Sequence, residues 1–161
     1  MLALLLAACA SGVRAQVRDP LTPQEADQVR DTAGHLDRRL PLLLGFAQLR
    51  LERFEQVRAA SPRPPDRDTQ LYALLMQFRG ILPEFDNAVD DLLSAPAKQY
   101  KTAKILDQAL TRLNALNAAL HRIQSDSTPS DLATYHFALD SCLDVASDSL
   151  QNVEAARTGK E

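Results

Sequence analysis

Four stretches of the chain repeat apolar residues at steps of three and four, and this spacing constrains the fold more than any other feature. Such spacing places apolar side chains on one face of an α-helix, whereas a half-buried strand would alternate every second residue. Composition agrees, because the 161 residues include only five Gly and no Trp. The pattern therefore predicts an all-α protein. The second stretch carries the clearest example: Leu71, Leu75, Phe78, Leu82, Phe85, Val89 and Leu92.

Clusters of Pro, Ser, Thr and Asp separate the four stretches, at residues 61–66, 94–96 and 125–129. Proline lacks the backbone donor that a helix interior needs, so these clusters end helices. The first helix is predicted to run without a break from residue 22 past Phe54. Short polar loops between amphipathic helices favour an antiparallel four-helix bundle, up-down-up-down, over residues 22–156, with a disordered tail at 157–161.

Two helices are predicted to begin with the same pattern of residue types. Thr22, Pro23 and Glu25 occupy the N-cap, first and third positions of a capping box, and residues 128–131 repeat the Thr-Pro-x-acid signal. Residues 21–25, Leu-Thr-Pro-Gln-Glu, also resemble the LTxxQ-type helix starts of periplasmic stress and metal-response proteins, which are small and helical. The resemblance covers five of the 161 residues, with Glu25 at the Gln position, and it carries no function over.

The N-terminal residues 1–15 predict an export signal, because residues 1–8 are wholly apolar and too short to span a bilayer. Two cleavage sites stay open. The run Leu-Ala-Ala before Cys9 resembles a lipobox, which would give a lipid anchor at Cys9, whereas Ala15 before Gln16 suits ordinary signal peptidase. The protein is accordingly expected to be periplasmic or secreted, or lipid-anchored in the cell envelope. Residues 16–21 would be a linker, and residues up to about 20 should pack against nothing.

The formal charge of −3 gives no general attraction to nucleic acid or to anionic lipid. No nucleic-acid partner is expected, and contact with a membrane is expected only through Cys9. Because Cys9 is removed or lipidated, Cys142 stays without a disulfide partner, and its place on an apolar seam predicts an inert buried thiol. The partner would be an unidentified envelope protein, and the apolar seams would also suit a homodimer.

Candidate ligand residues are few. His121 and His136 flank the expected turn near residues 126–129 at similar distances, so they can face one another as a metal or haem pair. The competing interpretation is that they merely flank the core. The chain lacks Cys-x-x-Cys-His, Glu-x-x-His and Gly-x-Ser-x-Gly motifs. We therefore expect no enzyme activity, no metal site and no cofactor.

Pro41 and Pro83 interrupt two apolar seams, with Gly45 and Gly80 close by. Helix-internal proline removes a hydrogen bond and can kink the helix. The sequence predicts that both helices bend at the same height and that any ligand pocket lies there. The alternative is that Pro41 divides a short first helix from a second one.

The leading functional hypothesis is a non-catalytic helical protein of a bacterial cell envelope that acts by protein contact or as an accessory factor. The alternative is a ligand-binding bundle that holds haem, a metal ion or an apolar molecule between its helices. Either requires a common core. The residues expected in it are Leu75, Phe78, Leu82, Leu113, Leu116, Leu120, Leu139 and Cys142.

Overall fold

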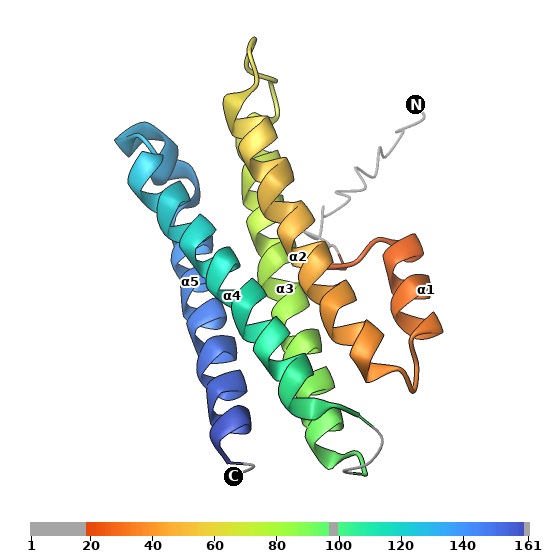
Figure 1. Ribbon diagram of the computed structural model, residues 1–161. Helices are drawn as coiled ribbons and strands as arrows, with labels where there is room; N and C mark the ends of the chain where they lie inside the picture. The colour runs from red at the N-terminus through yellow and green to blue at the C-terminus, as the bar shows by residue number, and fades with distance from the viewer. Residues whose placement is uncertain (1–18, 97–99, 160–161) are drawn as a thin grey trace, which may run out of the picture.

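The computed structural model describes residues 19–96 and 100–159. The described chain is all helical apart from its turns, with no strand, as predicted (Figure 1). The export signal, Cys9 and Gln16 lie outside the described residues. The helices are α1 (Pro23–Asp31), α2 (Leu36–Ala59), α3 (Arg67–Ser94), α4 (Thr102–Asp126) and α5 (Pro129–Thr158).

Both predicted helix starts are confirmed. The Thr22 hydroxyl accepts a hydrogen bond from the backbone N–H of Glu25 at 3.2 Å, and the Glu25 carboxylate accepts one from the Thr22 N–H at 2.8 Å. At α5 the Thr128 hydroxyl accepts from the Asp131 N–H at 3.2 Å. These side chains satisfy N–H groups that have no partner within the helix.

The prediction of one unbroken first helix is wrong, because the chain turns at residues 32–35, and the described residues form five helices instead of four. Gly34 adopts φ +81°, a left-handed conformation that other residues rarely take. The Thr32 hydroxyl also donates to the Val29 carbonyl at 2.7 Å, which helps to close α1. Pro41 is not the divider, since it lies within α2, and Pro83 lies within α3.

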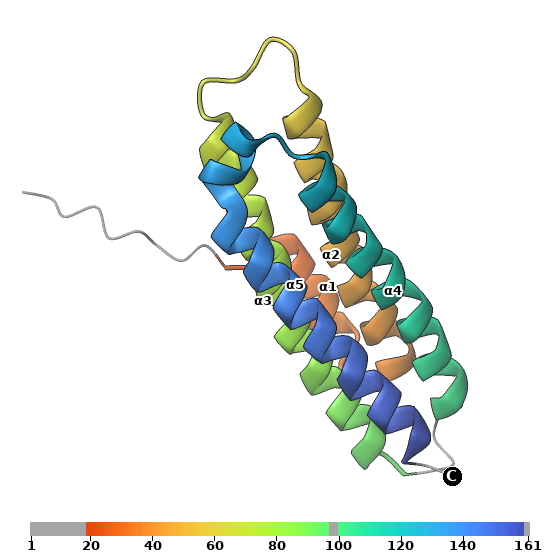
Figure 2. The same ribbon diagram turned by 90° about the vertical axis from the view of Figure 1, so that its left-hand side faces the viewer.

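The four long helices form two layers. In Figures 1 and 2, α2 and α4 lie side by side in one layer and α3 and α5 in the other. Arg67 bonds to Asp131 at 3.0 Å at the starts of α3 and α5, and Asp86 bonds to Ser149 at 2.9 Å further along both helices. The neighbours α3 and α5 therefore run in the same direction. The chain must cross diagonally from α3 to α4, instead of placing every helix beside its sequence neighbour.

One apolar core joins the layers, and every residue expected in it is buried. Toward one end of the bundle, Tyr135 packs its ring edge-on against Phe54, with centroids 5.2 Å apart. Its hydroxyl lies 2.6 Å from Ser127 Oγ, so the buried phenol keeps a polar partner. Helix periodicity thus located the core correctly.

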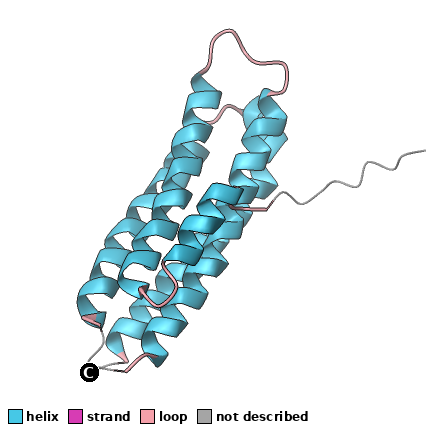
Figure 3. Ribbon diagram, turned by 90° about the vertical axis from the view of Figure 1, so that its right-hand side faces the viewer, coloured by secondary structure: helices cyan, strands magenta, loops and turns pink. Residues whose placement is uncertain are grey.

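Helix α1 lies against the side of the bundle, as Figure 3 shows, and a buried ion pair fastens it to α2. The Arg50 guanidinium, 8% exposed, donates to both Glu25 oxygens, at 2.8 and 2.5 Å, and to the Pro20 carbonyl at 3.0 Å. A Cβ added at Gly80 would lie only 2.7 Å from the Pro20 side chain. The expectation that residues up to 20 pack against nothing is therefore wrong for Pro20, whose ring fills the hollow that glycine leaves.

The prediction that a disordered tail begins at residue 157 is wrong for the first two of its residues. Helix α5 continues through Arg157 and Thr158, and the Arg157 Nε lies 2.9 Å from Asp107 Oδ1 on α4. This exposed pair and the hydrogen bond from the Thr158 hydroxyl to the Glu154 carbonyl extend the last turn. None of the described helices is long and apolar enough to cross a membrane.

Candidate binding groove

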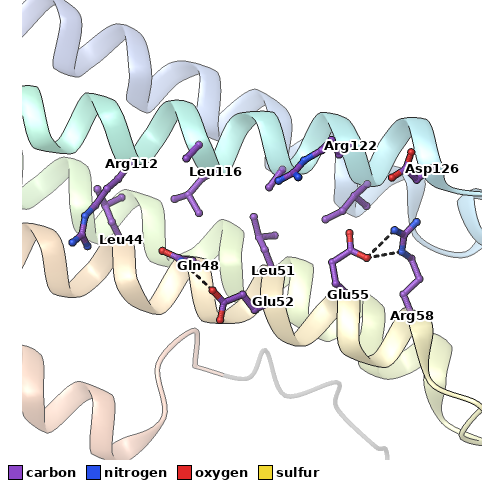
Figure 4. A pocket seen from close by; sticks show the side chains of 13 residues that line it. Leu44, Gln48, Leu51, Glu52, Glu55, Arg58, Arg112, Leu116, Arg122 and Asp126 are labelled. Carbon is purple, nitrogen blue, oxygen red and sulfur yellow. Dashed lines mark hydrogen bonds and ion pairs between the residues drawn. The ribbon is translucent and has the colours of Figure 1, made fainter.

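A groove of about 540 Å³ runs between α2 and α4. Of the four neighbouring pairs of long helices, α2 and α4 pack least closely. Their interface includes Ala115 and Ala119 on α4, whose methyl side chains are too short to fill the space between two helix backbones. Figure 4 shows the groove from close by, with side chains from both helices along it.

The floor of the groove is apolar and belongs to the core. Leu44 and Leu51 reach it from α2, and Leu116 and Ile123 reach it from α4. All four are buried, with exposed fractions between 1% and 5%. A guest molecule in the groove would therefore cover the top of the core without having to open it.

The edges of the groove carry charges of both signs. On α2, Glu55 pairs with Arg58 at 2.7 Å, and the Gln48 amide donates to Glu52 at 2.7 Å, as the dashed lines in Figure 4 show. On α4, the exposed Arg122 makes no side-chain hydrogen bond or ion pair with any described residue. The guanidinium of Arg122 is thus available to an incoming acidic group.

A second hollow of about 290 Å³ continues the groove past Pro41, and it shares Leu44 and Arg112 with the first. The Arg112 Nη1 donates to the Pro41 carbonyl at 3.1 Å. Of the four kink-level candidates, Pro41, Gly45, Gly80 and Pro83, only Pro41 lines either hollow. Gly45 has no atom within 4 Å of an added Cβ, Gly80 is covered by Pro20, and Pro83 is exposed. Both helices continue through their prolines, and the kinks themselves stay a prediction.

The histidine candidates lie away from the groove lining. His121 is exposed, and His136 is half-buried, with its ring 3.9 Å from that of Phe137. The Nδ1 of His136 lies 3.0 Å from the Leu132 carbonyl and donates to it, which leaves Nε2 as the nitrogen for any ligand. Within residues 19–96 and 100–159, no group of three or more His, Cys, Asp or Glu side chains is placed to hold a metal ion. A metal or haem pair at His121 and His136 remains a hypothesis.

Cys142 is fully buried, and its Sγ donates to the Leu75 carbonyl at 3.2 Å. Burial raises the pKa of the thiol to about 12, against a small opposing effect of Arg79. A thiolate is the reactive form of cysteine. The predicted inert thiol is therefore what the environment of Cys142 favours.

The pKa values of buried carboxyl groups differ with their partners. Burial alone would raise the pKa of Glu25, but hydrogen bonds from Arg50 and Thr22, with the Arg50 charge, lower it overall. Burial raises the pKa of Asp86, and the nearby Asp90 and Asp148 add to the effect, against the opposing influence of Ser149 and Asn152. Ionised Glu25 therefore stabilises the fold, whereas ionised Asp86 destabilises it.

Sequence reasoning missed the groove because helix periodicity does not say which helices become neighbours. The available signal was local: Ala115 and Ala119 stand at i, i+4 on the side of α4 next to its Leu seam. Comparison with known proteins adds no analogy, since no family, no curated protein and no solved structure matches the chain.

Proposed function

We propose that the protein is an exported, non-catalytic bundle of a bacterial cell envelope that binds another protein in the groove between α2 and α4. The functional unit would be the four-helix bundle of α2–α5, in which helices consecutive in the chain are antiparallel, up-down-up-down, while the neighbours within each layer run in the same direction, with α1 as an appended strap. The observation that carries the proposal is the groove itself, with an apolar floor and charged edges on two helices.

The chemistry of the groove suits an amphipathic helix from the partner. Helix-in-groove recognition lays an apolar face on an apolar floor, while charged flanks set the register and orientation. Arg122 on one edge and Glu52 on the other offer opposite charges to the two flanks of such a helix. The free protein exposes little apolar surface in the empty groove, because the floor residues are already buried.

Filling the groove tests this function. Ala115 lines the groove and is exposed, so Ala115→Trp can occupy the space without entering the core. The tagged full chain is purified from its native envelope as wild type, as Ala115→Trp and as Lys104→Glu, an exposed control on α4. We expect a stoichiometric partner that remains with the control and is lost with Ala115→Trp. Retention of the same partner by a folded Ala115→Trp would overturn the groove assignment.

The groove volume also favours a second candidate, a small apolar or amphiphilic ligand. Small-molecule sites commonly occupy about 300–1,000 Å³, and the groove falls in this range at about 540 Å³. Mass spectrometry of compounds released from the same purified samples distinguishes the two candidates. A compound present in wild type and control but absent from Ala115→Trp, without any protein partner, would favour ligand binding.

A further inference from the structure

Helix α2 carries a second heptad-like seam on its solvent side. Its inner seam points into the core through residues such as Leu40, Leu43, Ala47 and Phe54. A second series alternates steps of four and three along the opposite side of the helix. We call this series the outer seam, and it consists of Arg38, Leu42, Gly45, Leu49 and Glu52.

Most of the outer seam faces solvent: Arg38, Leu49 and Glu52 are exposed, whereas Leu42 is half-buried against the core. Leu49 is 50% exposed, which makes it one of the few large apolar residues facing solvent. A Cβ added at Gly45 would meet no atom within 4 Å, so the space above that glycine is open. Figure 1 shows α2 at the front of the bundle, with α1 on one side and α4 on the other. Another helix can therefore approach the α2 backbone at Gly45.

The residues of the outer seam are arranged almost symmetrically about Gly45. Arg38 and Glu52 lie seven residues before and after it, and Leu42 and Leu49 lie three before and four after. Two antiparallel copies of this helix that cross at Gly45 would place Arg38 of each opposite Glu52 of the other. They would also place Leu42 beside the second copy's Leu49. Such reciprocal pairing is what a two-fold interface requires.

We propose that the occupant of the outer seam is a second copy of this chain, with the two α2 helices crossing antiparallel at Gly45. The side-chain chemistry favours this partner. Arg38 makes no side-chain hydrogen bond or ion pair with the described residues, and Glu52 is held in place by Gln48 at 2.7 Å. Glycine at the crossing lets the backbones approach, and antiparallel helix dipoles attract.

The dimer is expected to be weak and concentration-dependent. A single pair of crossing helices buries less than the ~1,600 Å² of a standard interface, and weak transient contacts fall below about 1,200 Å². This inference goes beyond the proposed function, because it assigns a second partner to α2, although Glu52 belongs both to the outer seam and to the edge of the groove. The two can fail separately, since self-association is measured on the purified chain alone.

Charge reversal tests the crossing. Sedimentation equilibrium should show the wild-type mass rising from that of one chain toward that of two with concentration. Arg38→Glu and Glu52→Arg should each weaken association at least about tenfold, because each opposes like charges twice in the dimer. The double variant should return to within about threefold of wild type, and Lys104→Glu should match wild type. A wild-type mass that stays at one chain, or a double variant no better than the singles, would overturn the proposal.

A cross-link tests the geometry independently of charge. Gly45→Cys places a thiol at the crossing point of both copies, while the native Cys142 is buried and does not compete. Mild oxidation should give a disulfide-linked dimer, whereas Tyr72→Cys, exposed on α3, should give none above background. The groove variant Ala115→Trp should still form the cross-link when combined with Gly45→Cys. Equal cross-linking at both positions would contradict a specific crossing.

Discussion

The two layers of the bundle contain the same kind of helix pair but are closed in different ways. Both α3 with α5 and α2 with α4 are like-directed neighbours. Between α3 and α5, buried polar contacts join the helices at three heights, through Asp131, Cys142 and Ser149. Between α2 and α4, the contacts are an apolar floor, a rim of charges and an exposed hydrogen bond from Arg112 to the Pro41 carbonyl.

This difference leads us to propose that one layer mainly stabilises the fold and the other mainly serves binding. Removing one partner of a buried ion pair or hydrogen bond strongly destabilises the fold, because the other partner is then left buried without compensation. Exposed rim charges contribute little to folding and can serve recognition instead. On this proposal, the α3–α5 layer is the more firmly fastened side of the bundle, and the α2–α4 layer is the side that would bind a partner.

The sharpest test of this contrast exchanges one arginine on each layer for alanine. Arg67 is buried, pairs with Asp131 and donates to the Arg58 carbonyl at 3.3 Å. Arg67→Ala should lower the free energy of unfolding by about 3 kcal/mol, since it removes a buried side chain and leaves the half-buried Asp131 carboxylate with only the Thr128 hydroxyl as a side-chain partner. Arg122→Ala on the groove edge should change it by less than about 0.5 kcal/mol. Urea unfolding followed by circular dichroism measures both, and equal losses would erase the distinction between the layers.

Core leucines should show a smaller contrast. Leu139 on α5 is fully buried, whereas Leu116 on α4 is 5% exposed and forms part of the groove floor. Leu→Ala changes in packed cores cost about 2–5 kcal/mol, and the cost grows with the cavity that remains. We expect Leu139→Ala near the upper end of that range and Leu116→Ala near its lower end, because water and neighbouring side chains can enter the hollow left by Leu116. A larger loss for Leu116→Ala would mean that the groove is more tightly closed than its geometry indicates.

Much of the fold could be predicted from local signals in the sequence. Apolar spacing placed residues such as Phe78 and Leu120 in the core, and the capping chemistry of Thr22 and Thr128 fixed two helix starts. These features depend on residues close together in the chain. The break before α2 was missed because the sequence alone does not show that Gly34 adopts a left-handed conformation, and this conformation makes the turn.

The candidate site was not predictable in the same way. The groove depends on α2 and α4 becoming neighbours, and the diagonal path from α3 to α4 is a property of packing between distant segments. Likewise, the contact of Pro20 with Gly80 and the hydrogen bond from Arg50 to the Pro20 carbonyl join segments that are distant in the chain. The outer seam was present in the sequence, but only the open space at Gly45 distinguishes it from an ordinary solvent face.

The smallest predicted effect tests whether every polar contact of the α3–α5 layer is stabilising. Asp86 accepts a hydrogen bond from Ser149, but its other oxygen is buried without a partner, and burial beside Asp90 and Asp148 raises its pKa. A carboxyl group whose pKa is higher folded than unfolded destabilises the native state at neutral pH. This penalty disappears as pH falls through the folded pKa toward the unfolded value near 3.8.

Asp86→Asn removes the charge and keeps an oxygen for Ser149. It should therefore stabilise the protein at pH 7, by on the order of 1 kcal/mol, and the gain should vanish near pH 4. Glu25 has the opposite sign: its pKa is lowered on folding, so Glu25→Gln should destabilise at pH 7, and its stabilisation is lost as pH falls below about the ordinary value of 4.5. Thermal unfolding of both variants between pH 2 and 7 measures the two trends. If Asp86→Asn instead lost stability at pH 7, Asp86 would be a fastening group like Asp131, and the α3–α5 layer would be held by every one of its polar contacts.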